Sequence, residues 1–420
     1  MNNWNYEKLS KLCFRIGDGL HGTPSYVEGS GIYFINGNNL KNGRIEITNN
    51  TKCVSEEELK NNFIELNKNS LLLSINGTLG SMAFYRNEKV MLGKSSAYLN
   101  FTSPINKFYY YYFQLPFVQE YFFNVATGST IKNLSLKSIQ DFEVPVPEFN
   151  VWNNIANVLS SLDSKIELNN RINSELEGMA KTLYDYWFVQ FDFPDKNGMP
   201  YKTSGGKMVW NDELQREIPE GFLNCKLGDV LASTGTGLNP RENFVLGEGN
   251  NYYVTIKNIE QGRVILDNKC DKITDTSLEI INKRSDLKIG DILFTSIEPV
   301  GITYLILEKP KNWNINESVF TIRPNYEKVT SEFLYMFLSG DYIKSYTKNV
   351  SAGSIHKGIR HSLLKDCKFI LPERNIVDAF TMKIQPILNY VDIIQKENQK
   401  LTELRDWLLP MLMNGQVKVN

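Results

Sequence analysis

The second half of this chain repeats the first half, and this repeat constrains the fold more than any other feature. Matching residues keep their order, and their offset grows slowly from 219 residues between Tyr33 and Tyr252 to 225 residues between Gly128 and Gly353. Other matched groups are Asn39 and Gly43-Arg44 with Asn258 and Gly262-Arg263, and Leu73-Ser74 with Phe294-Thr295. A chain of 420 residues is long enough for two such domains. We therefore expect two similar domains, which would contact a target twice.

The composition is typical of a soluble globular protein. The apolar fraction is 42% and the charged fraction 22%, and no apolar run approaches the ~20 residues of a membrane helix. The amino terminus lacks a secretion signal, and the five scattered cysteines form no CxxC pair. We therefore expect no zinc site, no disulfide framework and a cytoplasmic location. With a net charge of −1, contact with nucleic acid would need positive charge gathered locally or supplied by partners.

Each copy begins with short strand-like segments separated by Asn-Gly and Gly turns, such as 31–35, 44–48 and 70–75 in the first copy. A helical aromatic stretch follows at 107–124 and again at 331–349. A Gly-Ser turn, another short strand and a Pro-Glu pair complete each copy. The pattern predicts an α+β fold with two similar β-rich globular domains and a pseudo-two-fold internal repeat.

A long segment after each copy carries apolar residues at 3-4 spacing, which predicts a coiled-coil seam. The seam positions are Leu159, Leu162, Ile166, Asn169, Asn173 and Leu176 in the first segment, and Ile384, Ile387, Val391, Ile394, Asn398 and Leu401 in the second. The spacing slips at Ala180 and Arg405, where we expect Met179 and Leu404 to take over. Pro386 predicts a bend or a late start of the second helix. We expect the helices 152–188 and 377–413 to lie side by side.

Two features of these helices leave alternatives open. The polar residues Asn173 and Asn398 either fix the register of the seam or lie exposed where the seam frays. The dense apolar residues at 184–188 and 408–413 either pack onto their own domains or form a patch for another subunit.

The recurring Gly-Ser loops are the candidate binding elements, because small, polar and basic residues on a loop suit contacts with phosphates and base edges. The alternative is a solvated turn with ordinary surface charges. The candidate DNA-binding residues are Ser129, Thr130, Lys132 and Asn133 in the first copy, and Ser354, His356, Lys357, Arg360 and Lys257 in the second. The aromatic run 108–113 could stack on bases, but its helical spacing favours a place in the core.

No catalytic constellation is present in the sequence. Residues 17–22 match GxGxxG, but Thr23-Pro24 follows where a dinucleotide site needs a helix, so we interpret the match as coincidence. Residues 93–95 imitate the end of a phosphate loop without its first glycine. The three histidines have no metal-ligand spacing. We therefore predict no catalytic residues, no metal and no cofactor in this chain.

The order of these elements resembles the specificity subunit of type I restriction–modification enzymes, over essentially the whole chain. The motifs that carry the resemblance lie at 18–24 (Asp-Gly-Leu-His-Gly-Thr-Pro), 128–135, 144–148, 186–194, 204–210 and 218–221. The second copy departs from the first of these motifs, because it has Thr-Gly-Thr-Gly-Leu-Asn-Pro at 234–240. The two copies are therefore expected to read different half-sites.

The resemblance implies a role for each part of the chain. Target recognition domains would occupy 1–150 and 221–375, long helices 151–190 and 376–420, and a connector 191–220. Each recognition domain would read one half of a split double-stranded DNA target. The antiparallel coiled-coil helices would set the gap and dock two modification (methyltransferase) subunits, which bring S-adenosylmethionine. Restriction (translocase/nuclease) subunits would add ATP- and Mg-dependent translocation and cleavage. This chain would then be a non-catalytic subunit, without membrane contact.

Two other functions remain open from the residues alone. One is a structural coiled-coil scaffold that binds only proteins, against which the Gly-Ser loops argue mildly. The other is an enzyme whose site has no recognisable motif. Activity of the purified chain by itself would favour the enzyme, whereas binding of DNA in the presence of partners would favour the recognition subunit.

Overall fold

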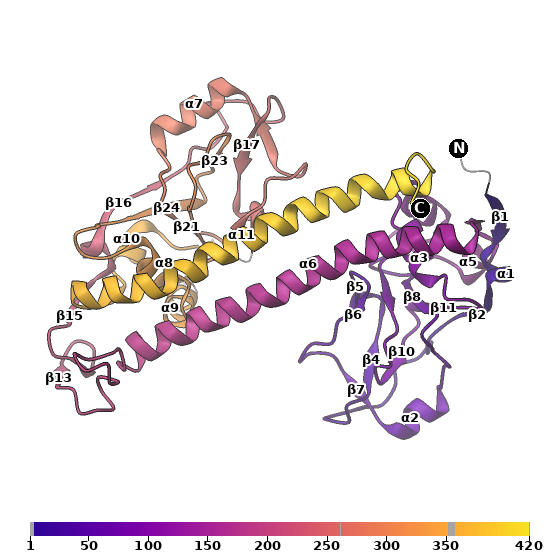
Figure 1. Cartoon of the computed structure of the whole chain (residues 1–420), viewed down its shortest axis with the longest axis horizontal. Helices are drawn as coiled ribbons and strands as arrows, with labels where there is room; N and C mark the ends of the chain where they lie inside the picture. The colour runs from indigo at the N-terminus through magenta and orange to yellow at the C-terminus, as the bar shows by residue number, and fades with distance from the viewer. Residues whose placement is uncertain (1–3, 261, 352–357, 420) are drawn as a thin grey trace. The chain divides into compact units, whose positions relative to one another are not determined.

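The computed structural model describes residues 4–260, 262–351 and 358–419 of the chain. The chain divides into two compact units, and each is described by itself. Unit 1 comprises Met1–Glu167 with Asn398–Asn420, and unit 2 comprises Leu168–Glu397. Each unit therefore contains one copy of the repeat together with part of both long helices, α6 (Phe149–Tyr184) and α11 (Arg374–Met413) (Figure 1).

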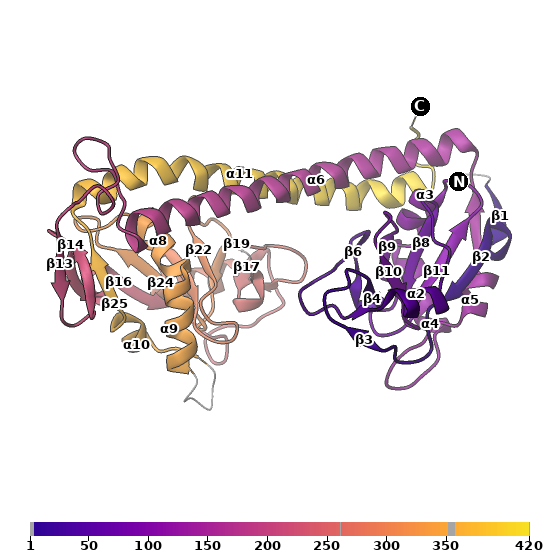
Figure 2. The ribbon, with the colours of Figure 1, turned by 90° about the horizontal axis from the view of Figure 1, so that it is seen from below.

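Unit 1 is built on an antiparallel sheet with the strand order β2-β11-β8-β9. A second sheet has the order β10-β4-β7-β3, in which β10 and β4 run parallel, and the strands lie on one side of the long helices (Figure 2). The elements are β1 (Asn5–Lys8), α1 (Leu9–Leu12), β2 (Cys13–Asp18), β3 (Tyr26–Val27), β4 (Tyr33–Ile35), η1 (Gly37–Asn39), β5 (Leu40–Lys41), β6 (Arg44–Ile45), β7 (Cys53–Val54), α2 (Glu56–Asn61), β8 (Ser70–Ser74), β9 (Met82–Phe84), β10 (Val90–Leu92), β11 (Ser96–Phe101), α3 (Asn106–Tyr112), α4 (Pro116–Val125), α5 (Leu136–Asp141) and β12 (Glu143–Val146).

Unit 2 repeats this plan, with the antiparallel order β16-β24-β21-β22 and the parallel pair β17 and β23. The predicted internal repeat and the α+β class with two β-rich modules are therefore confirmed. The elements are η2 (Asp185–Val189), β13 (Met208–Asn211), β14 (Arg216–Pro219), β15 (Leu223–Lys226), η3 (Leu227–Val230), β16 (Leu231–Thr236), β17 (Asn251–Val254), η4 (Ile256–Asn258), β18 (Ile259–Glu260), β19 (Arg263–Val264), β20 (Asp271–Ile273), α7 (Asp275–Arg284), β21 (Ile292–Thr295), β22 (Thr303–Leu305), β23 (Trp313–Ile315), β24 (Val319–Pro324), α8 (Ser331–Ser339), α9 (Asp341–Ser351), α10 (His361–Lys365) and β25 (Lys368–Leu371).

The aromatic run 108–113 lies in the core of unit 1, as its helical spacing favoured. All six side chains are buried on or directly after α3. The Tyr109 ring stacks on Phe101 of β11 with ring centroids 5.1 Å apart, and its hydroxyl donates a hydrogen bond of 2.9 Å to the carbonyl oxygen of Pro145. The buried phenol therefore keeps a partner for its polar atom, and these rings are not available to stack on bases.

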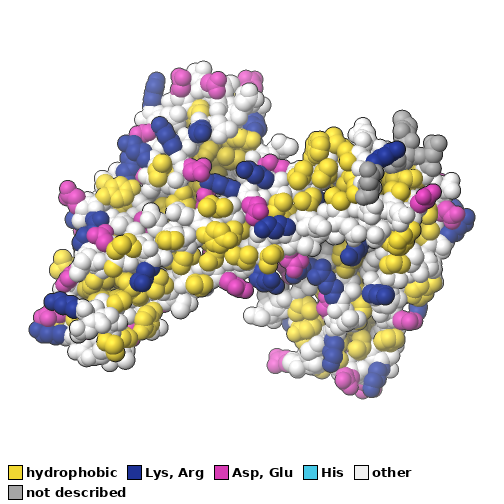
Figure 3. Space-filling model, viewed as in Figure 1, with side chains coloured by type: hydrophobic (Ala, Val, Ile, Leu, Met, Phe, Trp, Pro, Cys, Tyr) yellow, Lys and Arg dark blue, Asp and Glu magenta, His cyan; other side chains and the backbone are white. Residues whose placement is uncertain are grey.

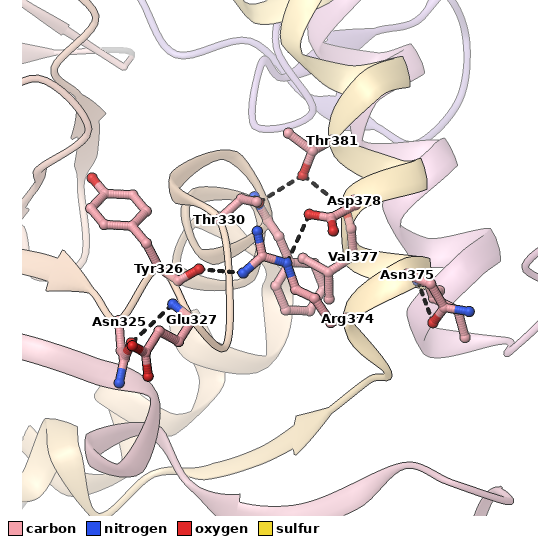
Figure 4. Close-up of polar contacts among 11 residues, drawn as sticks. Asn325, Tyr326, Glu327, Thr330, Arg374, Asn375, Val377, Asp378 and Thr381 are labelled. Atoms are coloured by element: carbon pink, nitrogen blue, oxygen red, sulfur yellow. Dashed lines mark hydrogen bonds and ion pairs between the residues drawn. The ribbon is translucent and has the colours of Figure 1, made fainter.

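The helix α11 begins at Arg374 and continues through Pro386, so the expected late start is wrong. Its first turn is anchored to the chain before α8 (Figure 4). Arg374 donates from Nε to Asp378 at 2.8 Å and from Nη1 to the carbonyl oxygen of Tyr326. One turn later the hydroxyls of Thr330 and Thr381 lie 2.7 Å apart. These contacts hold the helix from its first residue, twelve residues before the proline.

The seam positions face inward to different degrees. Leu159, Ile384, Val391 and Ile394 are buried, whereas Leu162, Ile166, Leu176, Ile387 and Leu401 are partly buried. Asn173 and Asn398 are buried as well, which excludes the alternative that they lie exposed where the seam frays. A buried polar residue in a seam can fix register at a cost in stability, so the register role of these two residues stays a prediction.

The expected shift of the seam to Met179 and Leu404 does not occur. Ala180 is buried while the Met179 side chain is 59% exposed. Arg405 stays on the inner side because its guanidinium donates to Asp163 of α6 at 2.8 Å, whereas Leu404 is 43% exposed. A small side chain at one position and a neutralised charge at the other keep the original spacing, which hydrophobicity alone does not reveal.

Each long helix ends in the core of the module that it does not follow in the sequence. In unit 1, Leu409 and Leu412 of α11 share a buried cluster with Trp152 of α6 and the aromatic residues of α3. In unit 2, Trp187 and Phe188, which continue α6, lie in a cluster with Phe380 of α11. The apolar end of each helix therefore does not pack onto the domain that precedes that helix in the sequence, and this alternative is wrong for both helices. Within each unit, the two helices therefore run antiparallel.

The remaining expectations concern cysteines, membranes and the segment 191–220. All five cysteines are free thiols. Within the described ranges, no helix is both long and apolar enough to cross a membrane. The segment 191–220 contains the hairpin of β13 and β14, and its Phe191 and Phe193 side chains are buried in unit 2.

Candidate functional site

The Gly-Ser loop of the first copy is closed by its own backbone. The amides of Thr127 and Asn133 each donate to the other residue's carbonyl oxygen, at 3.0 and 2.7 Å. Gly128 has a φ of +106°, and a Cβ there would lie 2.3 Å from the carbonyl oxygen of Ile131. Only glycine tolerates that conformation without strain, so the loop between Thr127 and Asn133 depends on it.

This loop is attached to the chain that leaves β8. The amide of Leu134 donates to the carbonyl oxygen of Ile75 at 2.9 Å, and Asn133 forms a β-bridge with Asn76. Both asparagines line a hollow of about 380 Å³ at the end of the antiparallel sheet. The other polar residues lining it are Asp18, His21, Lys94 and Ser135.

The loop after β2 forms the opposite wall of this hollow. The amide of Leu20 donates to the carbonyl oxygen of Leu92 at 2.8 Å, and the amide of Lys94 donates to that of Leu20 at 2.9 Å. A Cβ on Gly19 would lie 2.1 Å from the Leu92 carbonyl oxygen, so this close approach of two backbones requires glycine. The fold thus brings together the motif at 18–24 and the Gly-Ser loop, which are more than a hundred residues apart.

The side chains of the hollow mix donors, acceptors and both charges. His21 lies on the surface, and its Nε2 is 2.8 Å from the Asp18 carboxylate. Lys94 and Asn133 are exposed, and Asn76 is half-buried. These side chains can donate hydrogen bonds to a polar ligand and accept hydrogen bonds from it. Within the described ranges, no group of three or more His, Cys, Asp or Glu side chains could hold a metal ion.

The predicted site residues of the first copy are arranged unequally around this hollow. Asn133 lines it, whereas Ser129 and Thr130 are exposed on the tip of the loop. Lys132 folds back: its Nζ lies 3.4 Å from the carbonyl oxygen of Ala126 and 5.0 Å from the centroid of the Phe123 ring. The ammonium group is therefore held close to the loop.

The second copy builds the same backbone arrangement. Gly358 forms a bridge with Ile297, and the amide of Ile359 donates to the carbonyl oxygen of Ser296 at 2.8 Å. The predicted residues Ser354, His356 and Lys357 lie outside the described residues. Arg360 is exposed directly before α10, and Lys257 is exposed on η4, after a different strand.

One further histidine lies beside this arrangement. The His361 ring stacks on Phe320 of β24 with centroids 3.7 Å apart. Burial and the nearby Lys365 lower the pKa of His361, so the imidazole is held in its neutral form. A neutral stacked ring suits packing better than attraction to phosphate.

Sequence reasoning missed most of the hollow in the first copy. Asp18 and His21 belong to a motif that carried the family resemblance and to a GxGxxG match interpreted as coincidence. Lys94 was considered only within an imitation of a phosphate loop, and Asn76 was not singled out. The Asn-Gly pair at 76–77, directly after a buried strand, predicts a turn. It does not predict which distant segment contacts that turn in the folded chain. The GxGxxG match is structural: Gly17 lies within β2, where a Cβ would meet the Tyr98 ring.

The family model described as the type I restriction modification DNA specificity domain matches residues 27–178 and 219–405. The MjaIX type I restriction enzyme specificity subunit of Methanocaldococcus jannaschii is 25% identical over 386 residues, which cover 89% of this chain and 84% of that protein. The HindI specificity subunit of Haemophilus influenzae is 24% identical over 348 residues, which cover 71% and 74%. The crystal structure of a type I S subunit from M. genitalium has a similar fold, with a TM-score of 0.61 at 17% identity, covering 98% of this chain and 97% of that one.

Proposed function

This chain belongs to the family of type I restriction–modification DNA specificity subunits, and from that premise we propose that it reads a bipartite DNA target. Each copy of the repeat reads one half-site, and the helices set the separation of the half-sites. The observation that carries this proposal is the duplicated loop-and-strand arrangement. A β-bridge joins Asn133 to Asn76 in the first copy, and another joins Gly358 to Ile297 in the second. Two readers on one chain recognise two sequences at a constant gap.

The long helices support a constant gap because each is a single continuous element. The helix α6 has 36 residues, which at ~1.5 Å per residue corresponds to roughly 54 Å. The buried amides of the seam favour one alignment of α6 and α11, and the aromatic clusters at the helix ends hold both helices to their modules. In this proposal, the length of the helices sets the gap between the two half-sites.

Catalysis belongs to partners in this proposal. Two modification subunits bring S-adenosylmethionine and methylate adenine, and restriction subunits add ATP- and Mg-dependent translocation and cleavage of double-stranded DNA. This chain supplies recognition alone. Its net charge of −1 fits that division of labour, because partners that grip the same DNA supply much of the contact with phosphates.

The exposed side of α11 is the docking surface that we assign to a modification subunit. In unit 2 the helix exposes Met382, Tyr390 and Ile393 at 71%, 50% and 60%. Hydrophobic side chains are also visible along the helices in the space-filling view (Figure 3). Exposed apolar side chains that recur along one helix mark a surface that another protein covers.

Replacing Ile393 by aspartate is expected to weaken capture of the modification subunit at least tenfold, because a charge would be buried in an apolar contact. The measurement is the affinity of the full chain for purified modification subunit, by titration. Asn50→Asp is the control, since Asn50 is exposed and lies outside α11, and the change adds a negative charge without removing apolar surface. Equal affinities for both variants would contradict this docking surface.

Lys132 is expected to contribute one phosphate contact. Lys132→Ala should weaken binding at all DNA sequences and flatten the dependence of log affinity on log salt concentration by ~0.9. The complex with modification subunits is titrated with DNA at several salt concentrations, and Lys60→Ala on α2 serves as the control for loss of a surface lysine. A slope equal to that of the unaltered complex would remove Lys132 from the interface.

Mapping of methylated adenines tests the function itself. In cells that carry this chain and its partners, we expect methylation at a motif of two short sequences separated by a constant gap. The motif should disappear when the chain alone is deleted. Methylation that persists without the chain, or a single uninterrupted motif, would contradict the proposal and would favour a scaffold that binds only proteins.

A further inference from the structure

We propose that the hollow at the end of the antiparallel sheet in the first copy is where that module reads base edges. The proposal rests on the proposed function and adds the location and chemistry of one reading site. The reading groups are the amides of Asn76 and Asn133 and the ammonium of Lys94, beside the His21–Asp18 pair. The ligand is the major-groove edge of one half-site in double-stranded DNA.

Backbone hydrogen bonds fix the walls of the hollow. One wall is fixed by the backbone hydrogen bonds from Leu20 to Leu92 and from Lys94 to Leu20, at 2.8 and 2.9 Å. The other is fixed by the bond from Leu134 to Ile75 at 2.9 Å and by the bridge between Asn133 and Asn76. The backbone at these positions therefore loses little freedom on binding, which favours discrimination between similar ligands.

The chemistry of the polar side chains suits base edges. A carboxamide offers one donor and one acceptor side by side, which matches N7 and N6 of adenine in the major groove. A lysine ammonium matches the O6 and N7 acceptors of guanine. The His21 ring is held at Nε2 by Asp18, 2.8 Å away, which leaves Nδ1 as the nitrogen for a ligand.

The second copy provides an independent observation at the equivalent positions. Ser74 pairs with Ser96 in the first sheet, and Thr295 pairs with Val319 in the second. Ser96 and Val319 are therefore equivalent first residues of β11 and β24. Two residues before them, Lys94 in the first copy corresponds to Glu317 in the second. The bridges equate Asn76 with Ile297 and Asn133 with Gly358.

The backbone is kept at these positions while the side chains change in charge and polarity. The neighbouring core keeps its chemistry instead, as in Tyr110 and Tyr335 beside Gly43 and Gly262. Different side chains on the same backbone positions are the pattern expected where two modules read different base pairs. Ile297, which is 40% exposed, suits the methyl group of thymine in the same role.

The test changes the reading groups of the first copy and follows both half-sites. Asn76→Ile installs the residue type of the second copy, and His21→Gln provides a second, milder variant. Each full-length variant is assembled with its modification subunits, and affinity is measured for the cognate DNA and for DNAs with single base-pair changes in either half-site. We expect a roughly tenfold loss for the cognate DNA and an altered base preference at one or two adjacent positions of one half-site. The other half-site and the gap should be unchanged.

Asn50→Ala is the matched control, because Asn50 is an exposed asparagine of the same module outside the hollow. Unaltered base preference in both variants would overturn the proposal, and so would an equal loss for every DNA sequence, which indicates a phosphate contact. If Asn76→Ile shows no melting transition, that variant does not fold, and the result for His21→Gln decides the test. If the unaltered complex itself lacks a bipartite preference, the proposed function fails; if it has one that neither variant changes, this inference alone fails.

Discussion

Replacing Phe380 by alanine is expected to lower the free energy of unfolding by about 3–5 kcal/mol. Phe380 of α11 is fully buried in unit 2, and its ring centroid lies 5.0 Å from that of Phe188 and 5.7 Å from that of Trp187. It also meets Phe333 of α8 at 6.2 Å. The ring thus joins the start of α11, the end of α6 and the module between them. With Tyr184 at 6.0 Å, four aromatic rings surround Phe380. These rings collapse only partly into the space that it leaves, so the cavity cost adds to the lost burial.

Urea unfolding followed by tryptophan fluorescence measures this loss, since Trp187 is next to the altered site. Met382→Ala is the matched control, because Met382 lies on the same helix and is 71% exposed; its change should stay within about 0.5 kcal/mol. Equal midpoints for Phe380→Ala and Met382→Ala would show that the junction does not carry the stability assigned to it.

Replacing Asp291 by alanine is the second change with a large expected effect, a loss of about 3–5 kcal/mol. Asp291 precedes β21 and is completely buried, and its two carboxylate oxygens accept from Nε and Nη2 of Arg323, both at 2.7 Å. It also accepts from the amide of Lys288 at 2.8 Å. These hydrogen bonds raise the pKa of Arg323 further. Without the carboxylate, the partly buried guanidinium of Arg323 on β24 loses its counter-charge.

The contrast with a nearby exposed pair makes this prediction specific. Asp286 forms an ion pair with Lys288 at 3.3 Å, but its side chain is 72% exposed, so Asp286→Ala should cost less than about 0.5 kcal/mol. Thermal unfolding of the two variants measures the difference. A double-mutant cycle with Arg323→Met then isolates the coupling of the pair. Similar melting temperatures for Asp291→Ala and the unaltered chain would mean that the pair is not a stabilising contact.

Several features of this fold follow from local sequence patterns. The repeat is visible because both copies keep turn glycines and strand residues in the same order, and the structure builds matching sheets from them. The aromatic run 108–113 is identified as core because its spacing is helical and its surface is large. The continuous long helices follow from apolar residues at 3-4 spacing, despite Pro386, whose missing donor costs one hydrogen bond in a helix held elsewhere.

Other features depend on contacts between distant segments, and sequence reasoning was wrong or silent there. Met179 is more apolar than Ala180, yet Ala180 is buried in the core of unit 2 and Met179 is 59% exposed. Arg405 stays inside because Asp163 neutralises it. The hollow in the first copy escaped notice because its walls come from four segments, at 18–21, 75–76, 94 and 133–136, that meet only in the folded chain.

By itself, the sequence determined the duplicated α+β modules, the long helices and the family, because strand, turn and heptad signals act over a few residues and survive as readable patterns. The tertiary structure decided which module receives the end of each helix and which polar side chains gather at one sheet end. Those outcomes depend on packing and backbone pairing between residues far apart in the chain, and such pairings leave no periodic mark in a single sequence.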